Sequence, residues 1–153
     1  MGTVKKWAVI LGLTLLVGAP AVRAADQGEV KQMMGENFQV VLTALVGLVT
    51  THYEGLPERL DLIRQHAEDL KGSVPTGIND FERRTFITYA FNLEYKTANL
   101  ITVLKELIAR DKQRPDPNRL DMDYLRAVAA SHFGDMVTTC VLCHNEFRRQ
   151  VLK

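Results

Sequence analysis

Cysteine is scarce in this chain, which has two in 153 residues, Cys140 and Cys143. A structural zinc site needs four ligands in a closed geometry, and no second pair of cysteines exists to complete one. Internal repeats and low-complexity segments are absent as well. With 46% hydrophobic and 24% charged residues, the composition is that of one globular domain with its own core.

An excess of charge of one sign is also absent. The chain carries 19 basic and 18 acidic residues, a formal net charge of +1. The first 24 residues hold Lys5, Lys6 and Arg23 but no acidic residue, so the remainder is mildly acidic, at −2. Nucleic-acid-binding proteins carry an excess of basic residues, so this charge balance argues against a nucleic-acid partner.

The N-terminal segment is typical of a secretory signal peptide. MGTVKK gives a basic start, WAVILGLTLLVGA an apolar run, and Val22 and Ala24 the small residues that precede a cleavage site. We expect cleavage after Ala24, which leaves residues 25–153 as the mature domain in the periplasm. An uncleaved anchor is the alternative, but the run is shorter than the ~20 residues that span a bilayer. We expect no second apolar run long enough to cross a membrane, and therefore no membrane attachment after cleavage.

Strand patterns are absent from the rest of the sequence, where apolar residues recur at the spacing of amphipathic helices. We expect helices at about 28–52, from 56 to near Gly72 and Pro75, and at 79–112, and a fourth that is capped by Asn118 or Asp121. Asn79 and Glu82 form the pattern of a capping box. The expected core stripes are Met34, Phe38, Val41, Leu45 and Leu48; Leu56, Leu60, Ile63, Ala67 and Leu70; Phe86, Ala90, Leu93, Thr97, Leu100, Leu104 and Leu107; and Leu125, Val128, His132, Met136, Cys140 or Thr139, Cys143, Phe147 and Val151.

Four such helices with short linkers predict an all-α fold, an antiparallel up-down-up-down four-helix bundle. In this topology the first and fourth helices run antiparallel. The N-terminal part of the first helix then lies beside the C-terminal part of the fourth, where both cysteines are found.

The cysteines belong to the pentad Cys140-Val-Leu-Cys143-His144, which allows several interpretations. A thioredoxin-like dithiol needs a βαβ setting, and no strand is predicted. A disulfide between the two would close a very short loop and stabilise little. The pattern C-x-x-C-H is the attachment signature of c-type haem, in which the thiols form thioethers and the histidine binds iron. On a helix, residues i, i+3 and i+4 share one face, so the spacing suits that chemistry, and export suits it too.

The stretch FGDMVTTCVLCHNEFRR, residues 133–149, closely resembles the fourth helix of class II c-type cytochromes, the family of cytochrome c-prime and its six-coordinate relatives. The family pattern places an aromatic and a basic residue after the pentad, and Phe147 and Arg148 fill these places. The resemblance implies one covalent haem near the end of the bundle formed by the first and fourth helices, and often a homodimer. It also implies that Arg148 lies near the haem, against a propionate; a solvated basic face at the helix end is an equally open interpretation.

The resemblance implies that the sixth iron ligand, if there is one, comes from the first turns of the first helix. Met34 is in phase with the predicted core stripe and is the first candidate, and Met33 lies about 100° away on the helix. Plain core packing is the alternative for Met34. Aligning the family's Met-Gly pair with Met34-Gly35 would place Lys31 at the ligand position, on the core stripe. A site with no protein ligand also stays open.

The remaining histidines are not expected to bind iron. His132 lies about 18 Å from His144 along one helix. His66 fits an interfacial histidine with satisfied hydrogen bonds, and His52 belongs to the end far from the haem.

The sequence therefore predicts a monohaem electron carrier, not an enzyme, whose partners are other redox proteins. The alternative is a five-coordinate protein that binds NO or CO.

Overall fold

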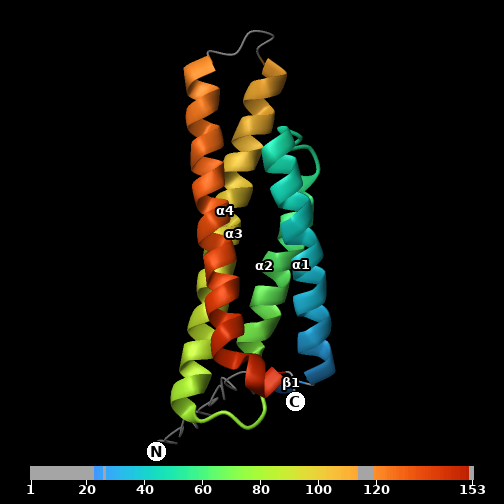
Figure 1. Ribbon diagram of the computed structural model, residues 1–153, viewed down its shortest axis with the longest axis vertical. Coiled ribbons are helices and arrows are strands. Elements are labelled where there is room, and N and C mark those ends of the chain that lie inside the picture. Colours follow the sequence, from blue (N-terminus) through green and yellow to red (C-terminus); the bar gives the residue numbers. More distant parts are fainter. Residues whose placement is uncertain (1–22, 26, 114–118, 152–153) are drawn as a thin grey trace, which may run out of the picture.

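The computed structural model of the chain describes residues 23–25, 27–113 and 119–151, and the predicted four-helix bundle is confirmed. The helices are α1 (Gln27–Thr50), α2 (Leu56–Gly72), α3 (Asp80–Gln113) and α4 (Arg119–Val151). They alternate in direction and pack side by side (Figure 1). α3 and α4 have 34 and 33 residues, whereas α1 and α2 have 24 and 17, so the long pair extends beyond the short pair at one end.

The helix ends follow the local signals in the sequence. The capping box of α3 is formed: the backbone N–H groups of Phe81 and Glu82 donate to Oδ1 of Asn79 at 2.9 and 3.0 Å, and the N–H of Asn79 donates to the Glu82 carboxylate at 2.8 Å. Pro57 lies in the first turn of α2, where its missing donor costs nothing. α4 begins at Arg119, so Asp121 lies inside its first turn and is not the cap; Asn118 lies outside the described residues.

The main core lies mostly between α2, α3 and α4, with Ala44 of α1 also in it, and the predicted stripes of α2, α3 and α4 are largely confirmed. Most of its fully buried members come from α2 and α3, because these helices carry dense rows of leucine and isoleucine. Fully buried side chains include Leu60, Ile63, Leu100, Leu104, Leu107 and Met136.

The predicted stripe of α1 is partly wrong. Phe38 and Leu45 are 58% and 45% exposed, whereas Val30 and Ala44 are 1% exposed. The helix is rotated from the expected position because the small residues Ala44 and Gly47 let it approach α2 closely. A Cβ added to Gly47 would lie 2.7 Å from Cδ1 of Leu56 and 2.8 Å from the carbonyl oxygen of His52.

This rotation leaves an apolar outer face on α1, which we define as Phe38, Leu42, Leu45, Val46 and Val49. The segment Gly28–Thr50 has a mean hydropathy of 1.3 over its most apolar window and is long enough to cross a membrane. The expectation that no second apolar run has this length is therefore wrong, although core helices of ordinary globular proteins pass the same test. α1 contains apolar residues all round, and its main neighbours are α2 and α4.

A short pair of strands was not expected from the sequence. β1 (Arg23–Ala25) pairs in parallel with β2 (Ser73–Pro75), with Ala24 opposite Val74. β2 is extended because Val74 is β-branched and precedes a proline, which disfavours helical backbone. The expected cleavage bond, between Ala24 and Ala25, lies within β1, and residues 1–22 of the expected signal peptide lie outside the described residues.

Two glycines of α1 give a matched test of this packing. Gly47→Ala should lower the free energy of unfolding by about 1–3 kcal/mol, because its Cβ would collide with the chain at His52 and Leu56. Gly35→Ala, which has no atom within 4 Å of its added Cβ, should raise it by about 0.5–1 kcal/mol. Urea unfolding followed by circular dichroism measures both values. Equal effects of the two substitutions would contradict the close approach of α1 to α2.

Candidate haem site

The pentad lies on one uninterrupted helix. α4 stays helical from Arg119 to Val151, so Cys140, Cys143 and His144 occupy positions i, i+3 and i+4 on one face. Both cysteines are free and half-buried, and His144 is exposed. Among the described residues, the His144 imidazole has no hydrogen-bond or ion-pair partner. Two thiols and one unengaged imidazole on one face are the groups that covalent haem attachment requires.

The surroundings of the pentad are apolar. Cys140 packs against the main core, and Cys143 packs against a second cluster at the end of the bundle. This second cluster consists of Val30, Leu70, Val74, Phe86, Ala90 and Phe147. Val141 and Leu142, between the two cysteines, are about half exposed, at 50% and 49%. The site is therefore bordered by hydrophobic surface, as a largely apolar macrocycle would need.

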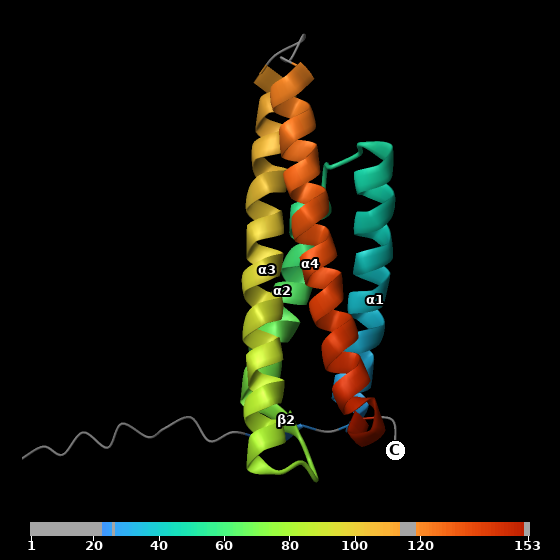
Figure 2. The same ribbon diagram turned by 60° about the vertical axis from the view of Figure 1, so that its left-hand side comes forward.

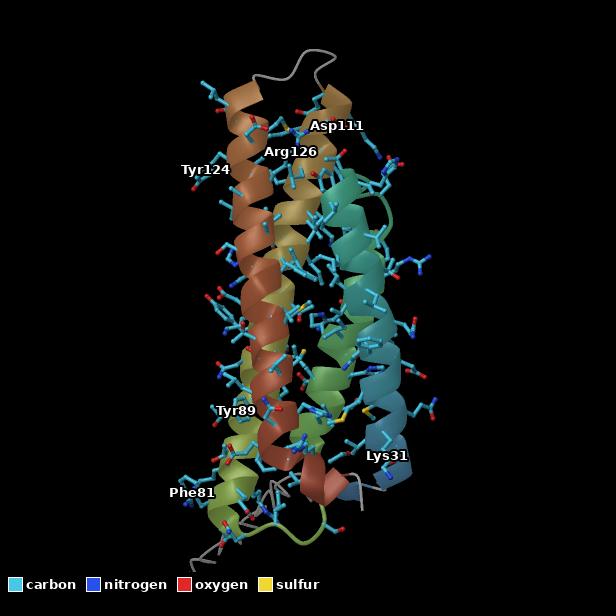
Figure 3. The ribbon with its side chains drawn as sticks, viewed as in Figure 1. Lys31, Phe81, Tyr89, Asp111, Tyr124 and Arg126 are labelled. Carbon is cyan, nitrogen blue, oxygen red and sulfur yellow. The ribbon has the colours of Figure 1, made fainter. Side chains whose placement is uncertain are left out.

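Phe147 holds the C-terminal end of α4 in place. Its side chain is fully buried, and its ring meets Phe86 edge-on, with centroids 5.3 Å apart and planes at 87°. Tyr89 makes a similar contact at 6.3 Å and 80°. Both partners belong to α3, and Figure 3 marks Tyr89 near the lower end of α4. The family resemblance placed an aromatic residue at this position, but the sequence could not identify its partners on α3.

The second cluster brings the predicted segments of α1 and α4 together. Met33 and Met34 both pack against it, as Cys143 does. Figure 2 shows the C-terminal end of α4 beside the N-terminal part of α1. The two methionines are both half-buried, so the structure does not separate Met34, expected inside, from Met33, expected at the flank.

Lys31 was expected on the core stripe, and this is wrong because its side chain is exposed (Figure 3). The buried stripe runs through Val30 and the two methionines, and residue 31 lies 100° further round the helix. Arg148 is also exposed.

The other histidines lie where the sequence places them. His66 is 8% exposed; its Nδ1 donates to Oδ1 of Asn37 at 2.8 Å, and its Nε2 lies 3.3 Å from the Glu36 carboxylate. His52 lies in the connection between α1 and α2, where Nδ1 is 2.9 Å from the carbonyl of Thr50. The sequence did not predict that Asn37 would bind His66. Asn37 follows Met34 by three residues and Met33 by four, which places it on the same face of the helix as the methionines.

Burial changes the chemistry of the thiols. It raises the pKa of Cys140 to about 11 and that of Cys143 to about 12, with a further contribution at Cys143 from Cys140 and Glu146. Thiols with such values are almost entirely protonated at neutral pH. They are poor nucleophiles toward oxidants and disulfides, because the thiolate is the reactive form.

No family model, curated protein or solved structure matches the chain. Within the described ranges there is also no group of three or more His, Cys, Asp or Glu side chains that could hold a metal ion.

The thiol pKa values give a prediction for the chain produced without haem. Alkylation by iodoacetamide at pH 8 should be about a hundredfold slower at Cys140 and about a thousandfold slower at Cys143 in the folded chain than in urea, because the thiolate fraction falls tenfold per pKa unit. The rate should rise steadily as the pH approaches 11. Reaction of the folded and unfolded chains at equal rates would contradict the burial of Cys140 and Cys143.

Proposed function

We propose that this protein is a c-type cytochrome of the class II kind. The observation that carries the proposal is the C-x-x-C-H pentad on the last helix of a four-helix bundle, with both thiols free and half-buried. In the proposal, Cys140 and Cys143 hold the haem covalently through thioethers, and His144 is the proximal ligand. Arg148, exposed one turn further along the helix, is available to a propionate at the haem edge.

Within this class, we propose that the particular function is electron transfer. Bound haem supplies a one-electron Fe(III)/Fe(II) couple, and the chain supplies the ligands and an apolar environment. Met34, with Met33 as the alternative, is the proposed distal ligand, because both pack against the second cluster, as Cys143 does. Ligation by a methionine thioether raises the reduction potential of haem iron. A raised reduction potential suits an electron carrier. No catalytic role is proposed, and the partners are other redox proteins.

The second cluster also favours the alternative function. The cluster is apolar, and the thioethers of both methionines pack against it. If neither methionine binds iron, an open coordination position would face a hydrophobic environment suited to NO or CO. The test of the proposal must therefore report on the coordination number of iron.

The visible spectrum of the purified protein provides this test. The reduced protein should show the sharp α and β bands of low-spin haem and should not change when CO is added, because a thioether occupies the sixth position. Met34→Ala should convert the spectrum to high-spin and admit CO, whereas Met33→Ala, the matched control, should leave it unchanged.

Two outcomes would contradict parts of the proposal. A wild-type protein that is high-spin and binds CO readily would exclude the carrier function and favour the gas-binding alternative. Covalent attachment is tested separately: haem should be extracted by acidic acetone from the Cys140→Ala/Cys143→Ala variant but not from the wild type. Equal extraction from both proteins would exclude thioether bonds.

We further propose that the chain is exported to the periplasm and cleaved after Ala24. The basic start, the apolar run and the small residues before Ala25 support this proposal. The mass of the protein from the periplasmic fraction should correspond to residues 25–153 plus one haem. A mass that includes residues 1–24 would instead favour a membrane anchor.

A further inference from the structure

α1 has apolar residues on both its buried and its exposed side, so these residues alone do not determine which side faces the bundle. One side of the helix buries Val30 and Ala44, while the outer face carries Phe38, Leu45 and other exposed apolar side chains. Hydrophobic attraction is not directional, and either face offers enough apolar surface to pack on the bundle. Periodicity alone indeed favours the orientation in which Phe38 and Leu45 point inward. The small residues Ala44 and Gly47 allow the rotation that the structure shows, and a directional contact is needed to fix it.

The buried side chain of His66 makes directional contacts that can do this. It reaches from α2 to two adjacent residues of α1, with Nδ1 2.8 Å from Oδ1 of Asn37 and Nε2 3.3 Å from the carboxylate of Glu36. Adjacent residues are about 100° apart around a helix, so one imidazole between two such partners opposes rotation in both directions. Hydrogen bonds also weaken steeply with angle, which makes the contact selective.

This contact lies one turn from the candidate iron ligands. Asn37 follows Met33 by four residues and Met34 by three, so all three share one side of α1. Rotation of the helix would move one methionine toward Cys143 and Phe147 and the other away from them. The orientation of Asn37 and the choice between the two thioethers are therefore coupled through a rigid helix.

We propose that His66 is a positioning residue for the distal side of the haem. By holding Glu36 and Asn37, it sets the rotation of α1 and thereby determines which methionine, and how firmly, binds the iron. This inference rests on the proposed electron-transfer function.

The test uses the haem-loaded protein and the variant His66→Phe, which keeps a planar ring of similar size but has no nitrogen. The ferrous variant should contain a five-coordinate fraction that binds CO and is about tenfold larger than in the wild type, the effect expected from losing about one hydrogen bond. Its midpoint potential should fall as thioether ligation weakens. His66→Gln, whose amide can donate to the same oxygens, should restore both quantities toward the wild type.

Two further variants separate positioning from general stability. Asn37→Ala removes one partner from half-exposed surface without altering the α2 core, and should shift the spectrum in the same direction as His66→Phe. His132→Phe is the matched control, because His132 is half-buried on α4 and has no polar partner among the described residues. It should change neither the CO-binding fraction nor the potential, even if it lowers the unfolding temperature.

The outcomes separate this inference from the proposed function. A wild-type protein that is high-spin overturns the electron-transfer function and this inference with it. A low-spin wild type whose spectrum, CO binding and potential are unchanged in both His66→Phe and Asn37→Ala overturns the positioning role alone. In that case His66 serves only the stability of the α1–α2 contact, and thermal unfolding would report the loss.

Discussion

The candidate site depends on one geometric constraint, the continuity of α4 through the pentad. Only an unbroken helix presents residues i, i+3 and i+4 as neighbours, and only then do Cys140, Cys143 and His144 form one set. The helix is held at this end by Phe147, which is fully buried against two aromatic rings of α3. The chemistry proposed for α4 therefore relies on packing that α3 supplies.

The antiparallel arrangement of α1 and α4 adds the second half of the site. A residue near the start of the chain can meet one near its end because the bundle returns to the same end after four helices (Figure 1). The two helices meet in the second cluster, which includes Val30 of α1 and Phe147 of α4. Met33, Met34 and Cys143 pack against this cluster. α1 is thus both a structural helix and the candidate source of the distal ligand.

The sequence predicted the parts of the fold in which one interaction dominates. α2 and α3 each have a single apolar stripe, so their buried faces were predicted correctly. The Asn79–Glu82 capping box is a local signal and was also predicted correctly. α1 is apolar on more than one side, and its rotation depends on the size of Ala44 and Gly47 and on the contact between His66 and Asn37. These are long-range contacts between α1 and α2, which periodicity within one helix cannot reveal. The β1–β2 pairing was missed for the same reason.

If the chain is exported as proposed, the apolar composition of α1 affects its passage through the export channel. No Asp, Glu, Lys or Arg occurs between Glu36 and Glu54, so this segment approaches the hydrophobicity at which a channel releases a helix sideways into lipid. Asn37, Thr43 and Gly47 lower that hydrophobicity, and Asn37 and Gly47 also shape the contact with α2. Replacing such residues with leucine would make α1 more apolar and could halt the chain in the membrane before it folds. The same few side chains would thus constrain both the packing of α1 and the proposed export of the protein.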